Sequence, residues 1–148
     1  MEGKHHIIVE NKRGRYEFDI NRNITIIRGD SGTGKTVLIE MLAEYQRYGR
    51  SSGITVESDC GIAVLDNRDW ALVLEQYTKT IVFIDDGCQF VTTQEFASKV
   101  ESSDNYFVIV TRDGLPNLLY SKEEIYGIRT SPQNAGLKKT HNEFYRLI

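Results

Sequence analysis

Three short runs of consecutive apolar residues dominate the hydrophobic pattern: NITIIR from Asn23, TIVFID from Thr80 and NYFVIVT from Asn105. Strands that helices cover on both faces have this pattern, and such strands pair in parallel. Near the N-terminus, HHIIVE and YEFDI alternate apolar and polar residues around a turn that contains Gly14. This alternation predicts an antiparallel hairpin beside the parallel strands.

Segments with helical spacing of apolar residues separate these strands. Segment 35–49 ends at Gly49, which favours a C-terminal stop. Segment 67–79 predicts a second helix capped by Asn67, and segment 92–103 predicts a third with a Thr cap and Glu95 in its first turn. The predicted buried face of the first helix consists of Val37, Leu38, Met41, Leu42 and Tyr45.

Shorter strands are predicted in segments 54–58 and 61–66, and a late strand pair in segments 124–130 and 142–148. The alternation of buried strands with amphipathic helices predicts an α/β fold, with a mainly parallel sheet and helices on both of its faces. The antiparallel N-terminal hairpin is added to this sheet. We expect a single domain over residues 1–148.

The composition narrows the class of protein. A chain of 148 residues with 40% hydrophobic residues forms one domain with a real core. The net charge of −3 argues against a generally basic nucleic-acid-binding surface, although basic residues gather in segment 127–148, where a solvated hairpin is the favoured interpretation. The sequence contains neither a membrane span nor a signal peptide, so we expect a cytoplasmic protein.

The spacing of the cysteines and histidines matches no metal-binding motif. Cys60 and Cys88 lie far apart without a C-x-x-C pair, so a structural zinc site is not expected. His5 and His6 are adjacent and point to opposite faces of a strand, and we interpret them as ordinary strand residues.

The segment between the first apolar run and the first helix fits the pattern G-x-x-x-x-G-K-[ST] at every fixed position. Glycines allow backbone N–H groups to point inward at phosphate oxygens, and the following helix presents its positive end to the same anion. We expect Lys35 to reach the β- and γ-phosphates and the Thr36 hydroxyl to be a ligand for Mg²⁺. The predicted nucleotide-binding segment consists of Gly29, Asp30, Ser31, Gly32, Thr33, Gly34, Lys35 and Thr36.

This segment resembles the Walker A element of P-loop NTPases. The resemblance is strong over residues 24–45 and moderate over residues 80–112. It implies a three-layer P-loop NTPase fold with a minimal additional-strand ATPase core. It also implies ATP and Mg²⁺ as cofactors.

The second apolar run ends in two carboxylates, Asp85 and Asp86. Asp85 matches the Walker B position, whose carboxylate belongs to the Mg²⁺ shell opposite the P-loop hydroxyl. The next residue in similar ATPases is commonly Glu, which polarises the attacking water. The shorter Asp86 holds its carboxylate about 1.5 Å further back, which predicts slow hydrolysis.

The third apolar run ends in Thr111 and Arg112. Thr111 resembles the polar sensor residue of additional-strand ATPases and either contacts the γ-phosphate or bonds to backbone. Arg112 either neutralises transition-state charge or lies in solvent. Arg28, directly before the P-loop, is expected to face outward.

These motifs predict Mg²⁺-dependent ATP binding with slow hydrolysis. We expect the protein to act together with a protein partner or a second copy of itself. A GTPase is disfavoured because the chain has no guanine-reading N/T-K-x-D element. An ABC-type signature LSGGQ and a helical lid are also missing from the sequence.

Two alternatives remain. A nucleoside or nucleotide kinase is one, because FIDDGCQF, residues 83–90, resembles a segment of thymidine kinases. A non-hydrolysing nucleotide-dependent interaction module is the other, favoured by Asp86 and the missing lid.

Overall fold

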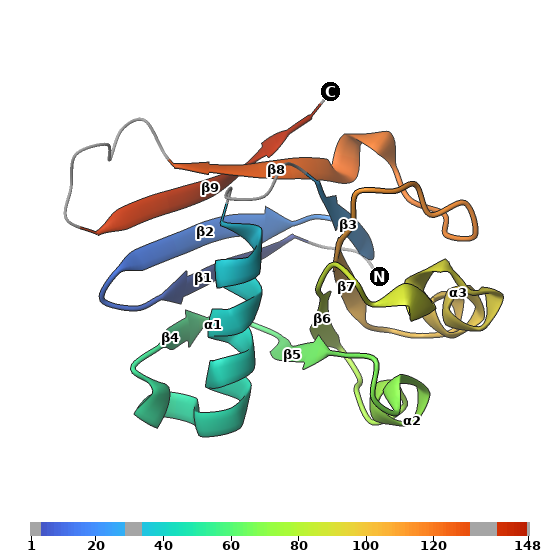
Figure 1. Ribbon diagram of the computed structural model, residues 1–148, viewed down its shortest axis with the longest axis horizontal. Coiled ribbons are helices and arrows are strands. Elements are labelled where there is room, and N and C mark those ends of the chain that lie inside the picture. The colour runs from blue at the N-terminus through green and yellow to red at the C-terminus, as the bar shows by residue number, and fades with distance from the viewer. Residues whose placement is uncertain (1–3, 29–33, 131–138, 148) are drawn as a thin grey trace.

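The computed structural model describes residues 4–28, 34–130 and 139–147 (Figure 1). These residues form one mixed sheet with the strand order β4-β1-β2-β9-β8-β3-β7-β6-β5. The strands are β1 (His5–Glu10), β2 (Gly14–Ile20), β3 (Ile24–Ile27), β4 (Thr55–Glu57), β5 (Gly61–Leu65), β6 (Thr80–Ile84), β7 (Tyr106–Val110), β8 (Ile125–Thr130) and β9 (Thr140–Arg146). The α-helices are α1 (Lys35–Tyr48), α2 (Trp70–Leu74) and α3 (Gln94–Glu101), and the 3₁₀ turns are η1 (Gly49–Ser52), η2 (Gln89–Thr92) and η3 (Lys122–Glu124).

The predicted parallel core and N-terminal hairpin are both confirmed. Strands β8, β3, β7, β6 and β5 pair in parallel, in that order. Strands β1 and β2 form an antiparallel hairpin, and β4 and β9 add further antiparallel pairs with β1 and β8. A parallel β2–β9 pairing joins the hairpin to the core, so the whole sheet is mixed.

Helix α1 follows the prediction closely, except at Val37. It ends before Gly49, whose φ of 60° suits a residue without a Cβ atom. Leu38 and Leu42 are fully buried, whereas Val37 is 51% exposed. The buried arc extends instead to Ile39, which leaves Val37 about 100° from Leu38, on the solvent side of the helix.

The second helix is shorter than predicted, and the third is confirmed. Helix α2 covers only Trp70–Leu74, and its N-cap is Asp69 rather than Asn67. The chain turns before α2 with Asp69 at φ 50°, a left-handed conformation that Asp and Asn tolerate best. At α3 the Thr93 hydroxyl accepts a hydrogen bond from the Phe96 N–H, which is the predicted Thr cap.

Two hydrophobic cores lie on opposite faces of the sheet. Along β6, Ile81 and Phe83 belong to the core that α1 covers, whereas Val82 and Ile84 belong to the core that includes α2 and α3 residues. Successive strand residues point to opposite faces, so helices cover both faces of the parallel strands, as predicted. Among the described residues, no helix is long and apolar enough to cross a membrane.

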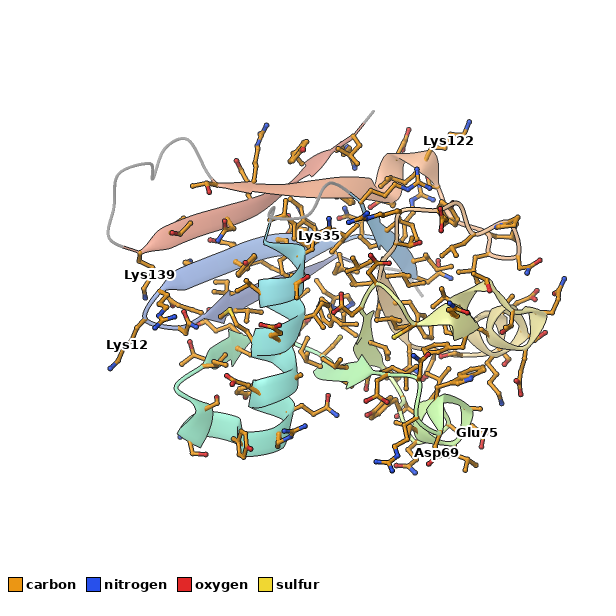
Figure 2. All side chains as sticks on the ribbon, in the orientation of Figure 1. Lys12, Lys35, Asp69, Glu75, Lys122 and Lys139 are labelled. Atoms are coloured by element: carbon orange, nitrogen blue, oxygen red, sulfur yellow. The ribbon has the colours of Figure 1, made fainter. Side chains whose placement is uncertain are left out.

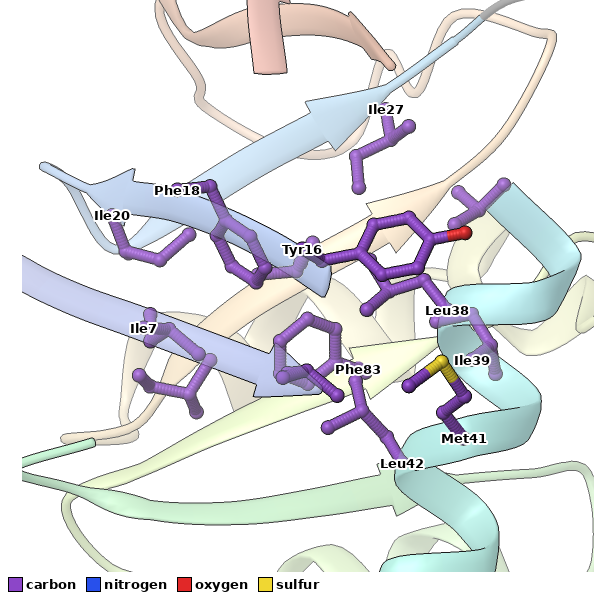
Figure 3. Packing of buried hydrophobic residues seen from close by; sticks show 14 of the residues in the cluster. Ile7, Tyr16, Phe18, Ile20, Ile27, Leu38, Ile39, Met41, Leu42 and Phe83 are labelled. Carbon is purple, nitrogen blue, oxygen red and sulfur yellow. The ribbon is translucent and has the colours of Figure 1, made fainter. Parts of the chain in front are cut away.

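The sheet curls around α1, so that strands distant in sheet order face one another. Strands β2 and β6 are five strand spacings apart, which in a flat sheet would separate them by about 24 Å. The ring of Phe18 on β2 nevertheless lies 6.2 Å from that of Phe83 on β6, centroid to centroid. The apolar face of α1, with Leu38 and Leu42, packs in the same cluster (Figure 3).

Replacing Phe18 by alanine should destabilise the fold strongly. Its ring stacks on Phe144 at 4.2 Å besides contacting Phe83, so its loss leaves a cavity between the two halves of the sheet. We expect the free energy of unfolding in urea to fall by about 3–5 kcal/mol. Leu119→Ala, at an 88% exposed position, is the control and should change stability by less than about 0.5 kcal/mol. A Phe18→Ala effect below about 1 kcal/mol would show that the two halves do not depend on this contact.

Candidate functional site

Four neighbouring parallel strands end at one edge of the sheet, and a polar residue follows each of them. Their registers align Ile27 of β3 with Val110 of β7, and Ile84 of β6 with Leu65 of β5. The carboxyl ends of neighbouring parallel strands therefore meet at the edge where α1 begins, which is where open α/β sheets bind ligands. The residues that follow the strands are Arg28, Asp66, Asp85, Asp86, Thr111 and Arg112.

The first turn of α1 is anchored to the hairpin by Tyr16. Its hydroxyl donates a 2.9 Å hydrogen bond to the Gly34 carbonyl, and burial raises the pKa of Tyr16, which keeps the phenol protonated. Gly34 has φ 95°, and a Cβ atom there would lie 2.9 Å from the Tyr16 hydroxyl oxygen. Position 34 therefore requires glycine for both conformation and space.

Of the predicted phosphate-binding segment, the structure describes only the last three residues. Lys35 begins α1 and is 7% exposed, and Thr36 beside it is exposed (Figure 2). The helical hydrogen bond from the Leu38 N–H to the Gly34 carbonyl fixes where the helix starts. The remaining predicted residues lie outside the described part of the chain: Gly29, Asp30, Ser31, Gly32 and Thr33.

Lys35 and Asp85 lie at the same edge of the sheet although they are far apart in the sequence, since one begins α1 and the other follows β6. Burial raises the pKa of Asp85, and the adjacent Asp86 charge raises it further, while the positive charge of Lys35 lowers it. One carboxylate oxygen of Asp85 also accepts a 2.8 Å hydrogen bond from the Asp86 N–H. Asp85 is thus a partly desolvated carboxylate next to a second carboxylate, and a bound cation would stabilise its ionised form.

Asp86, Thr111 and Arg112 lie at the same edge in different environments. The Arg112 Nε is 3.9 Å from a carboxylate oxygen of Asp86, and both side chains are exposed. The buried Thr111 hydroxyl accepts a 3.2 Å hydrogen bond from the Asp113 N–H and lies 3.3 Å from the Asp113 carbonyl. Thr111 therefore bonds to turn backbone, one of its two expected roles, and its contact with phosphate stays a prediction.

Asp66 is a third carboxylate at this edge that the motifs did not identify. It ends the segment GIAVLD as Asp85 ends TIVFID, so the same pattern of an apolar strand followed by Asp was present in the sequence. Its side chain accepts a 3.0 Å hydrogen bond from the Arg68 N–H. Burial and the charges of Asp85 and Asp66 raise the pKa of the Cys88 thiol, so both carboxylates lie near this cysteine.

Arg28 does not face outward as expected. Its Nε is buried, and the structure gives that atom no hydrogen-bond partner within the described residues. Arg28 lines a hollow of about 500 Å³ together with Lys122 and an apolar set of side chains. The other lining residues are Leu115, Pro116, Leu118, Tyr120, Ile125 and Leu147.

Comparisons with known proteins identify no family for this chain. A scan against protein-family models and a search of curated proteins both found no match. The interpretation of the edge therefore depends on its own residues and on the resemblance of segment 29–36 to a Walker A element.

Asp85→Asn should stabilise the protein in the absence of ligands. The pKa of Asp85 is raised in the folded state, so its ionised form costs stability at neutral pH, and this cost disappears as the pH falls through the raised pKa towards 3.8. The asparagine variant should therefore have a higher melting temperature than the wild type at pH 7, and this advantage should vanish near pH 3.8. Asp113→Asn, at an exposed carboxylate of the same edge, should show no such advantage. A variant less stable than the wild type at pH 7 would contradict the assignment.

Proposed function

We propose that the protein binds ATP in a Mg²⁺-dependent manner and hydrolyses it slowly, in the cytoplasm and together with a protein partner or a second copy. The observation that carries this proposal is that Lys35, at the start of α1, and Asp85, directly after β6, lie at the same edge of the sheet. In the P-loop resemblance these two residues have complementary roles, one toward phosphate and one toward the metal. Neither residue belongs to the two hydrophobic clusters of the described residues.

The residues at this edge suit a nucleoside triphosphate. Backbone N–H groups of segment 29–36 and the positive end of α1 would hold the phosphates, and Lys35 would neutralise charge between the β- and γ-phosphates. Mg²⁺ prefers oxygen ligands, and Thr36 and Asp85 offer a hydroxyl and a carboxylate. The metal would supply charge neutralisation on the phosphates, and Asp66 adds a further carboxylate to its surroundings.

The strand order also supports the proposal. Strand β7 lies between β3, which leads to segment 29–36, and β6, which ends at Asp85. One strand inserted between these two is the arrangement that additional-strand ATPases are named for. Thr111 and Arg112 therefore follow a strand that lies between the end of β3 and the carboxylates after β6.

Slow hydrolysis follows from the position of Asp86. Its exposed side chain is free to orient a water molecule, but it is one methylene shorter than Glu. Arg112 lies beside it at 3.9 Å and would have to leave this weak ion pair to meet charge on the transferring phosphate. A second arginine from a partner would accelerate the reaction.

A kinase-like phosphotransferase is the second candidate, because the Arg28 hollow is suited to an acceptor. The hollow opens next to the residue that precedes the phosphate-binding segment, and its walls combine apolar side chains with Arg28 and Lys122. Such walls favour an acceptor with an apolar body and an anionic group. A non-hydrolysing interaction module remains the third candidate, and turnover measurements separate all three.

Lys35→Ala should weaken ATP binding. A charged donor to phosphate contributes about 1.5–3 kcal/mol, so the dissociation constant, measured by calorimetry with Mg²⁺, should rise roughly 10–100-fold. Lys12→Ala, at an exposed position in the turn of the hairpin, is the control and should bind like the wild type. Unchanged affinity in a folded Lys35→Ala variant would refute the site.

Asp86→Asn separates hydrolysis from binding. If Asp86 orients the water, kcat for release of inorganic phosphate should fall at least about 100-fold while ATP affinity is retained. Asp86→Glu should raise kcat, because the longer side chain reaches further towards the water. Phosphate transfer to a nucleoside with negligible release to water would favour the kinase. Binding without turnover in the wild type, unaffected by Asp86→Asn, would favour the interaction module.

A further inference from the structure

A second cluster of metal-ligating side chains lies at the opposite end of the parallel strands. It comprises His5 at the start of β1, Asp59 and Cys60 just before β5, and Tyr106 at the start of β7. Because β5, β6 and β7 run in parallel, the ends where Cys60 and Tyr106 lie are remote from the edge that carries Asp85. The cluster is therefore independent of the proposed nucleotide site.

Three donor atoms of different chemistry converge in this cluster. The His5 Nδ1 lies 2.7 Å from a carboxylate oxygen of Asp59 and 3.4 Å from the Cys60 sulfur. One ligand atom from each of the three residues lies within 4.8 Å of the other two. The His5 side chain is 15% exposed and Asp59 is 65% exposed, so the cluster is supported by protein on one side and open to solvent on the other.

We propose that His5, Asp59 and Cys60 bind a divalent cation of the zinc type. Imidazole nitrogen, thiolate sulfur and carboxylate oxygen are the three ligand types that Zn²⁺ takes, and three protein ligands leave a fourth tetrahedral position for water. A thiolate and an imidazole are poor ligands for Mg²⁺ or Ca²⁺, which prefer oxygen. The donor set therefore selects a borderline transition metal.

The observed separations are near those of a tetrahedral site. Ligands at about 2.3 Å for sulfur and 2.05 Å for nitrogen would lie about 3.6 Å from each other, against the 3.4 Å between the His5 Nδ1 and the Cys60 sulfur. The Asp59 oxygen would need to retreat from its 2.7 Å hydrogen bond to about 3.4 Å, which its exposed side chain permits. The sulfur lies 3.8 Å from Nε2 and 3.4 Å from Nδ1, so it sits over the face of the ring and would have to move towards the Nδ1 lone pair for one cation to contact both atoms.

Tyr106 supplies the outer support that metal-bound histidines need. Its hydroxyl is 2.8 Å from the His5 Nε2, and the ring is fully buried. With the metal bound, Nε2–H donates to this hydroxyl, which leaves the Nδ1 lone pair for the cation. Metal binding would release the proton of the Cys60 thiol, and that of Nδ1 where present, to solvent.

Co²⁺ titration of the full chain tests the proposal, with absorption as the readout. Thiolate-to-cobalt charge-transfer bands and intense visible bands of tetrahedral Co²⁺ are expected in the wild type, and Zn²⁺ should displace them. Cys60→Ser should abolish the charge-transfer band, and His5→Gln should weaken binding at least about 100-fold. The chain contains matched controls: Cys88→Ser and His6→Gln should bind like the wild type.

Tyr106→Phe tests the outer support and should weaken Zn²⁺ binding roughly 10–100-fold. Zn²⁺ should also raise the melting temperature of the wild type but not that of His5→Gln, which separates a bound ion from a folding defect. Absence of the cobalt bands in the folded wild type would overturn the proposal. So would bands that persist in Cys60→Ser, or bands that are lost in Cys88→Ser.

Discussion

The packing of α1 inside the curl of the sheet is the constraint on which the rest of the structure depends. One apolar face of a single helix is covered both by the N-terminal hairpin and by the parallel strands. Phe18 and Phe83 meet across this enclosure, and Phe144 extends it towards β9. Because apolar burial is the dominant favourable term in folding, this shared core holds two otherwise separate halves of the sheet in register. The first turn of α1 is thereby fixed in position relative to strands that are distant from it in the sequence.

Both candidate sites are consequences of this enclosure. At one end, the fixed helix start places Lys35 at the same edge of the sheet as Asp85, and burial removes water from both groups. At the other end, the curl brings β1 against the starts of β5 and β7, which unites His5 with Asp59, Cys60 and Tyr106. In a flat sheet β1 and β7 would be about 24 Å apart, so this cluster cannot exist without the curl. A cation there would tie the hairpin to the core at the end remote from α1's first turn.

The local pattern of the sequence was sufficient for the parallel strands, the hairpin, α1 and α3, because each has a clear apolar period. It was insufficient at α2, where the pattern predicts Asn67 as the N-cap but the chain makes a further turn and the N-cap is Asp69. The motifs single out Lys35, Thr36 and Asp85 as candidates. Asp66 follows an apolar strand as Asp85 does but matches no motif, and Arg28 was expected to face outward, so the structure is needed to place both at this edge. The His5 cluster was missed for a different reason. Spacing rules assume ligands close in sequence, whereas these come from segments that only the curl brings together.

The hydrogen bond between the Tyr16 hydroxyl and the Gly34 carbonyl connects the start of α1 to the N-terminal hairpin. Gly34, the last residue before α1, is bonded to a side chain of β2, so the start of the helix cannot shift without straining or breaking this hydrogen bond. Strands β1 and β4 pair in succession beyond β2, so the same bond links the helix start to the outer strands of the sheet. The hairpin therefore connects the start of α1, through one tyrosine hydroxyl, to the outermost strand on its side of the sheet.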